Sequence, residues 1–142
     1  MSGQFDDIIR VSDILQERAL EKHRKNMAET KRLNDELAQI DDLRKAVQQD
    51  GASLNARQMS GADTLWQTWL VTRRATILQE MAMARALEGE SLVQARRAQS
   101  RFEAAQEMAR EEHKKSLERR QLAQTEDLEA LGRLRNALGR AF

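Results

Sequence analysis

The fold of this chain is decided by residues 63–138, DTLWQTWLVTRRATILQEMAMARALEGESLVQARRAQSRFEAAQEMAREEHKKSLERRQLAQTEDLEALGRLRNAL. The stretch contains no proline and only two glycines, Gly89 and Gly132. Because proline is the residue that breaks helices most strongly, the stretch is predicted to form one long helix. At the rise of an α-helix it would be ~110 Å long, more than three times the width of a compact domain of this mass. A globular core cannot contain it.

The composition is also that of long helices and coiled coils. Of the 142 residues, 33% are charged and 4% aromatic, and there is no proline, tyrosine or cysteine. The net charge of +1 gives no strong attraction to nucleic acid or anionic lipid. The absence of cysteine excludes disulfides and thiolate metal sites and fits a reducing compartment.

No targeting or membrane segment is predicted. The first residues, MSGQFDDIIR, lack the basic and apolar parts of a signal peptide. No run approaches the ~20 apolar residues that cross a bilayer. We therefore expect a soluble, cytoplasmic protein.

A first helix is predicted over residues 6–47, with Asp6 or Asp7 as its N-cap. Many of its apolar residues recur at intervals of three and four, which places them on one narrow stripe. The stripe consists of Ile8, Val11, Leu15, Ala19, Met27, Leu33, Leu37, Ile40 and Val47. Residues 21–32 are nearly all polar, so this part of the helix is expected to be the loosest.

Residues 48–62, QQDGASLNARQMSGA, interrupt the pattern and form the predicted connection. Gly51 suits a helix C-terminal cap, and Gly61 suits a second bend. Folding the chain here lays the two helices antiparallel. The predicted fold is therefore all-α, a two-helix antiparallel coiled-coil hairpin that forms a single elongated domain over residues 1–142.

The second helix, predicted over residues 63–138, carries the clearer seam. Its apolar positions are Trp66, Leu70, Ile77, Met81, Ala84, Ala95, Ala98, Phe102, Ala105 and Ala109, followed by Leu117, Leu128, Leu131 and Leu138. In the hairpin, Leu33 would face Ile77, and Ile8 would face Phe102. The second helix would overhang the first by ~30 residues at its C-terminus. An isolated helix of that length is marginal, so the overhang needs a partner.

Nothing in the sequence predicts catalysis. There is no phosphate-binding glycine loop, no serine-nucleophile motif and no zinc-protease motif. His23 and His113 lie in highly charged segments and are expected to be solvated, with a metal role far less favoured. A two-helix rod also offers no enclosed pocket. We expect no enzyme activity, no cofactor and no metal.

Four pairs of basic residues lie along the second helix, but acidic neighbours offset their positive charge. Lys114, Lys115, Arg119 and Arg120 lie among Glu111, Glu112 and Glu118, and no aromatic side chains are available there for base stacking. Nucleic-acid binding is therefore not expected. Direct insertion into a membrane is not expected either, because the polar faces carry both signs of charge.

Trp66 and Trp69 lie three residues apart directly after the connection. A narrow seam can bury one tryptophan but hardly two. Two interpretations remain open. The pair either caps the core of the hairpin against Leu43, Val47 and Met59, or forms a partly exposed anchor for another protein.

Part of the second helix resembles the corresponding helix of a known protein family. Residues 90–111, ESLVQARRAQSRFEAAQEMARE, together with the glycine-bearing turn and the aromatic start of the helix, look like the FliJ/YscO group of bacterial flagellar and type III secretion proteins. That family carries the pattern R-x-x-L-x-x-A-x-x-x-x-x-x-x-E-x-L. Leu92, Ala95 and Glu103 fit it, whereas Gly89 replaces the first Arg and Ala105 the last Leu.

The resemblance implies a non-enzymatic stalk at the cytoplasmic face of the membrane-embedded export apparatus, monomeric when free. Its partners would be the hexameric export ATPase, the export gate and substrate chaperones. The implied gate contacts are Gln39, Leu43, Trp66, Trp69, Leu70 and Ile77. The implied ATPase-ring contacts are Ile8, Val11, Phe102, Leu117, Leu128 and Leu131. The alternative is a generic structural coiled coil that homo-oligomerises or scaffolds other helical proteins.

Overall fold

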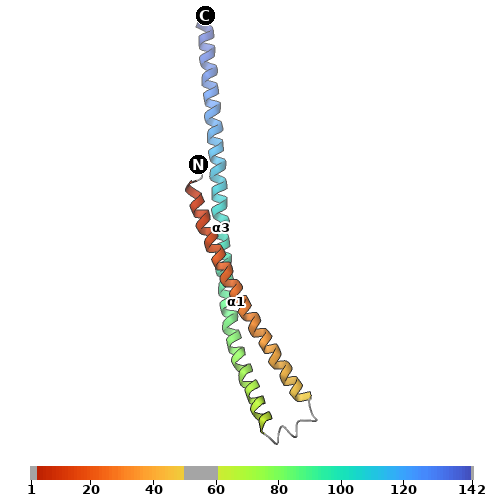
Figure 1. The fold of residues 1–142 in the computed structure, drawn as a ribbon. Helices are drawn as coiled ribbons and strands as arrows, with labels where there is room; N and C mark the ends of the chain where they lie inside the picture. Colours follow the sequence, from red (N-terminus) through yellow and green to blue (C-terminus); the bar gives the residue numbers. More distant parts are fainter. Residues whose placement is uncertain (1–2, 50–60, 142) are drawn as a thin grey trace. The chain divides into compact units, whose positions relative to one another are not determined.

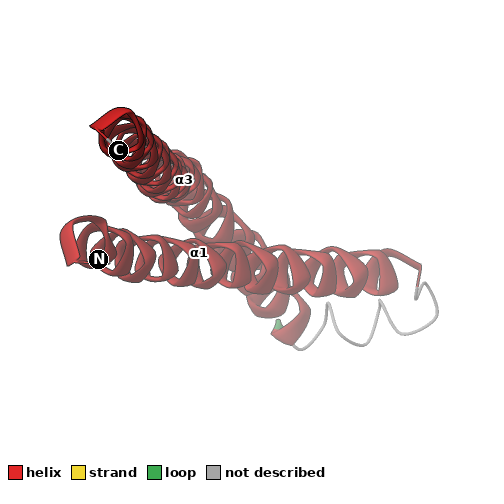
Figure 2. Ribbon diagram, turned by 90° about the horizontal axis from the view of Figure 1, so that it is seen from above, coloured by secondary structure: helices red, strands yellow, loops and turns green. Residues whose placement is uncertain are grey.

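The computed structural model describes residues 3–49 and 61–141 and consists of two helices (Figure 1). Helix α1 spans Gly3–Gln49 and helix α3 spans Ala62–Ala141. Figure 2, coloured by secondary structure, shows helix and no strand within these described ranges. The predicted all-α helical hairpin is confirmed.

The helix boundaries differ slightly from the prediction. Helix α1 begins at Gly3, so the predicted cap at Asp6 or Asp7 is wrong and both residues lie inside the helix. Asp6 is in the first turn, where its charge complements the positive end of the helix dipole. The predicted bend at Gly61 is confirmed. The predicted cap at Gly51 falls outside the described residues.

Gly61 occupies a backbone conformation that glycine alone adopts easily. Its φ is 71°, in the left-handed region, and its carbonyl accepts a hydrogen bond from the backbone N–H of Leu65 at 3.3 Å. Glycine lacks the Cβ that is strained in this region. The residue therefore allows the chain to turn into the first turn of α3.

The chain divides into two compact units, which are described separately. The hairpin unit comprises Leu15–Ala98, and the terminal unit comprises Met1–Ile14 with Gln99–Phe142. In the hairpin unit the two helices run antiparallel and diverge toward their connection (Figure 1).

The core of the hairpin unit is small and aliphatic. Its buried members are Leu33, Ile40, Leu70, Ile77, Met81 and Ala84, and Leu37 packs against them. The residues predicted to face one another, Leu33 and Ile77, belong to this single cluster. Burial of a few bulky side chains from each helix therefore supplies most of the apolar contact between them.

Two cross-helix ion pairs flank this core. The Nε and Nη2 atoms of Arg73 lie 2.8 and 2.7 Å from Oε1 of Glu36. The Nε of Arg74 donates to Oδ1 of Asp41 at 2.9 Å. All four side chains are partly exposed, so these pairs contribute more to the alignment of the helices than to stability.

The seam of α3 follows the predicted stripe closely. From Leu70 to Ser116 its buried and half-buried residues include an unbroken series in alternating steps of three and four, the spacing of a coiled-coil seam. They include Ala84, Ala95, Ala98, Phe102, Ala105 and Ala109, as predicted. The predicted seam position at Trp66 is exposed instead.

The predicted stripe on the N-terminal half of α1 is wrong except at Ala19, which is half-buried as predicted. Ile8, Val11, Leu15 and Met27 are each between 42% and 55% exposed. The seven-residue repeat explains the error. Continued backward from the core residues of α1, it reaches a largely polar set of half-buried side chains that shares only Ala19 with the predicted stripe. These are Phe5, Ile9, Ser12, Gln16, Ala19, His23 and Asn26.

In the terminal unit, α3 extends beyond the last turn that packs against α1. Ala105 is buried, and Phe102, Ala109 and Ser116 are half-buried. Every described side chain from residue 117 to 140 is exposed. We call residues 117–140 the free segment. The predicted overhang is therefore present but begins after Ser116 rather than near residue 105.

Candidate functional site

A polar layer crosses the seam of the hairpin unit, where the sequence predicted loose packing. Nδ1 of His23 lies 2.8 Å from Oγ of Ser91. Nδ2 of Asn26 donates to the carbonyl of Leu87 at 3.2 Å. Thr30 is buried, and its hydroxyl donates to the carbonyl of Asn26 at 3.1 Å. Hydrogen bonds thus replace apolar burial between these turns of the two helices.

The direction of the His23–Ser91 hydrogen bond follows from the other bond of the serine. The single hydroxyl proton of Ser91 is donated to the carbonyl of Glu88 at 3.0 Å. Its oxygen therefore accepts from His23, which donates through Nδ1–H. The expectation that His23 is a solvated surface residue is wrong, since its ring is half-buried and fixes α1 on α3.

The charged side chains of the described residues pair locally rather than gathering into a metal-ligating cluster. No group of three or more metal-ligating side chains occurs among the residues described. On the exposed face of α1, Arg32 donates to both carboxylate oxygens of Glu29, at 3.0 and 2.6 Å. These hydrogen bonds lower the pKa of Glu29 and raise that of Arg32. The pair lies one helical turn apart in water, where it supports the helix locally.

Gln16 gives a stability prediction. Its Oε1 is buried and has no hydrogen-bond partner in the part of the chain described. Gln16→Leu removes this unsatisfied acceptor and adds apolar contact, so we expect the free energy of unfolding to rise by about 1–2 kcal/mol. Urea unfolding followed by circular dichroism measures the change. Glu17→Leu, at the exposed neighbouring position, is the matched control. A fall in stability for Gln16→Leu would contradict the assignment.

The two tryptophans at the start of α3 form an exposed pair. The rings of Trp66 and Trp69 stack with centroids 5.3 Å apart and planes 10° from parallel. They are 42% and 52% exposed, and the neighbouring Leu65 is 74% exposed. This geometry favours the anchor interpretation over the core interpretation, because the rings cover each other and leave broad apolar faces in solvent. Met59, the remaining proposed core neighbour, lies outside the described residues.

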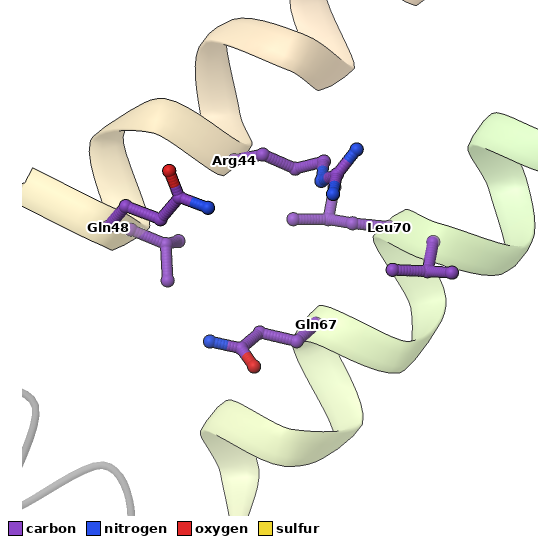
Figure 3. A pocket seen from close by; sticks show the side chains of 6 residues that line it. Arg44, Gln48, Gln67 and Leu70 are labelled. Carbon is purple, nitrogen blue, oxygen red and sulfur yellow. The ribbon is translucent and has the colours of Figure 1, made fainter.

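A small pocket lies beside this pair, where the helices diverge. Arg44 and Gln48 from α1 and Gln67 and Leu70 from α3 point into it (Figure 3). Val47 and Val71 complete the lining, and the volume is about 130 Å³. Leu70 is 1% exposed and forms the floor. The guanidinium of Arg44 makes no ion pair with a described carboxylate. The volume is that of about one large side chain.

The residues implied as gate contacts do not all reach the surface. Gln39, Leu43, Trp66 and Trp69 are exposed. Leu70 and Ile77 are buried in the core of the hairpin unit. A partner could touch Leu70 only through the pocket, and Ile77 is closed to it. We define the tip surface as Leu43, Arg44, Trp66, Gln67 and Trp69.

All the residues implied as ATPase-ring contacts except Phe102 are exposed, and they belong to two sets of exposed apolar side chains in the terminal unit. Ile8, Val11 and Ile14 lie on the outer side of α1. The second set comprises the leucines of the free segment, Leu117, Leu122, Leu128, Leu131, Leu134 and Leu138, exposed by 42% to 69%. Phe102 is half-buried in the seam. Sequence reasoning did not single out Ile14, Leu122 or Leu134, although periodicity alone could have found Leu134.

No protein-family model, curated protein or solved structure matches the chain. Within the described residues, neither helix contains a segment apolar enough to cross a membrane. The two exposed surfaces and the family resemblance of residues 90–111 are therefore the features that point to a function.

Proposed function

We propose that this chain is a non-enzymatic coiled-coil stalk of a bacterial flagellar or type III protein export apparatus. The observation that carries the proposal is the free segment, a helix with a row of exposed leucines and no partner among the described residues. A lone amphipathic helix of this length gains its stability by docking. If the chain is a stalk, the ring of subunits that it enters supplies that partner.

Two further features support a linking role. The tip surface offers stacked tryptophans beside a pocket, a composition enriched at protein interfaces. It lies at the start of α3, whereas the free segment lies at the end of the same helix. One chain thereby presents two separate docking surfaces. We assign the free segment to the export ATPase, the tip surface to the cytoplasmic part of the export gate, and the exposed helix faces to substrate chaperones.

The ATPase contact is tested with the export ATPase of the same cell. Adding this protein should promote ring assembly and raise ATP turnover. The paired substitutions Leu128→Ser and Leu131→Ser should abolish the effect, because they interrupt the leucine row. Leu122→Ser is the matched control, since Leu122 is equally exposed but lies on the opposite side of the helix. An unchanged turnover with the native protein would refute the ATPase assignment.

The tip surface gives a separate binding prediction. Trp66→Ala with Trp69→Ala should weaken binding to the gate domain by at least about tenfold, because stacked, exposed tryptophans are typical interface anchors. Helicity should remain nearly unchanged, since both rings lie outside the core. Isothermal titration and circular dichroism measure the two quantities. Met83→Ala, at another exposed position of α3, is the control. Loss of helicity in the double variant would instead support the interpretation that the tryptophans belong to the core.

The second candidate function is a structural coiled coil that scaffolds other helical proteins. The exposed leucines of the free segment favour it as well, because they fit any helical partner. The ATPase experiment separates the two, since a general scaffold has no effect on turnover.

A further inference from the structure

The side chains buried between α1 and α3 change in size along the hairpin unit. One part is the cluster described above, which we call the aliphatic core. It consists of Leu33, Ile40, Leu70, Ile77, Met81 and Ala84. From residue 85 to residue 98, the buried side chains of α3 are only Ser91 and Ala95. Because hydrophobic stabilisation grows with the apolar area buried, this second part of the seam contributes much less of it.

The side of α1 that faces this second part is also weakly apolar. We call residues 15–29 the strap, which lies in the red to orange part of α1 in Figure 1. No side chain in this described range is buried, and the first buried side chain of α1 is Thr30. The half-buried positions of the strap are Gln16, Ala19, Leu20, His23 and Asn26. Three of these five are polar, so the strap adds little apolar contact to the seam.

Polar contacts do not compensate for this difference. Within the described residues, the strap is joined to α3 by two side-chain hydrogen bonds, from His23 to Ser91 and from Asn26 to the carbonyl of Leu87, and by no ion pair. Such bonds add little net stability, because water replaces them when the groups separate. The buried Oε1 of Gln16 has no partner in the described part of the chain and regains water on opening.

The stronger contacts all lie on the other side of Thr30. The two cross-helix ion pairs, Arg73 with Glu36 and Arg74 with Asp41, flank the aliphatic core. Thr30 itself donates to the carbonyl of Asn26 in its own helix rather than to α3. The hairpin unit therefore has a well-held part and a weakly held part, with a boundary at Thr30.

The strap can also leave α3 without losing all of its own structure. Its sequence, LQERALEKHRKNMAE, contains no glycine, proline or β-branched residue and is rich in strong helix formers. A local ion pair between Arg24 and Glu21, at 3.4 Å, lies within it. A separated strap keeps partial helicity, which limits the cost of opening.

We infer that the strap separates from α3 as an independent unit while the aliphatic core stays paired. Folded proteins open locally in units whose stabilities differ, and the strap has the features of a low-stability unit. The opening exposes the seam of α3 at Ser91 and Ala95 without loss of the hairpin. It concerns the hairpin unit by itself and does not depend on the export function.

Thiol labelling of the full-length chain tests the inference, because the chain contains no cysteine. Ala95→Cys and Ala84→Cys each introduce one thiol at a buried alanine, and only Ala84 belongs to the aliphatic core. Each labelling rate with dithiobis(nitrobenzoic acid) is divided by the rate for the same variant unfolded in urea. The normalised rate should be at least about tenfold higher for Ala95→Cys. Equal normalised rates would overturn the inference.

A second substitution separates local opening from global unfolding. Ile77→Val weakens the aliphatic core mildly and should speed exchange of the slowest backbone amides of residues 33–47 by about threefold or more. Labelling of the Ala95→Cys thiol should change by less than about twofold, because the core remains paired in the open state. Gln16→Leu should slow that labelling by about fivefold. Equal acceleration of labelling and core exchange by Ile77→Val would show that the thiol is exposed only by global unfolding, against the inference.

Hydrogen exchange of the native chain gives a measurement that needs no substitution. Once separated from α3, the strap is a marginal helix whose amides exchange with solvent. Mass spectrometry should show exchange of residues 15–29 at least about tenfold faster than exchange of residues 33–47. Equal protection of the two ranges would overturn the inference.

Discussion

Ile77→Ala should lower the free energy of unfolding of the hairpin unit by about 3 kcal/mol, the largest loss expected from one substitution in this chain. Ile77 is 0% exposed and lies in the cluster with Leu33 and Met81. Truncation removes buried methyl groups and leaves a cavity, and two packed helices can close such a cavity only partly. Few other large side chains share the core, so little apolar contact compensates for the loss.

Circular dichroism during urea or thermal unfolding measures this effect. We expect a clear fall in the midpoint and a loss of helical signal in the variant at temperatures where the native chain remains folded. Once the two helices separate, each depends on its own marginal stability. Leu78→Ala is the matched control, since Leu78 is the next residue on the same helix and is 41% exposed. Equal effects of the two substitutions would show that the helices do not pack through Ile77.

The seam of α3 could be predicted from the sequence because its apolar residues coincide with the repeat. Met81, Ala84, Ala95 and Phe102 lie three, four or seven residues from other apolar positions, so periodicity identifies the correct face. The packed face of α3 could therefore be predicted from periodicity alone. The hairpin itself followed from the two apolar runs and the glycine-bearing connection.

The N-terminal half of α1 could not be predicted in the same way, because there the apolar residues and the packed residues differ. Ile8 and Val11 have apolar side chains but lie on the outer face, whereas Ser12 and Gln16 occupy the seam. Periodicity identifies the face with the most apolar residues. The face that packs is set instead by the core around Leu33, which fixes the rotation of α1 about its axis. The strong repeat at Leu33 therefore overrides the weaker local stripe.

The candidate surfaces were predicted in part. Exposure of Leu128 and Leu131 follows from helix length, since no residue of α1 remains to cover them. The contact between His23 and Ser91 joins residues 68 positions apart and depends on the register of the two helices. The stacking of Trp66 on Trp69 depends on side-chain rotation. Neither register nor rotation is encoded in spacing alone.

The polar layer gives the second large prediction, which has the opposite sign. His23→Leu with Asn26→Leu should raise the free energy of unfolding by about 2 kcal/mol, because apolar contact replaces partly desolvated polar groups in the seam. The two groups of α3 that lose a hydrogen bond each keep another partner. Ser91 still donates to the carbonyl of Glu88, and the carbonyl of Leu87 keeps its place in the α-helical backbone.

The same double variant should lose uniqueness of structure. Polar residues at seam positions are known to fix register and oligomer state at a cost in stability, since only one alignment pairs them. In the native chain His23 finds Ser91 and Asn26 finds the carbonyl of Leu87 in one register only. Leucine accepts neighbouring registers and additional helices. The variant should therefore sediment as a mixture of larger species while its unfolding midpoint rises.

Lys22→Leu with Lys25→Leu provides the control, because it adds two leucines to the exposed face of the same turns. It should leave the unfolding midpoint nearly unchanged, since neither position lies in the seam. Sedimentation velocity and urea unfolding on the two double variants give the comparison. A polar-layer variant that is less stable than the native chain would show that His23 and Asn26 stabilise the hairpin outright. A more stable variant that keeps the native sedimentation coefficient would show that the aliphatic core alone fixes the register.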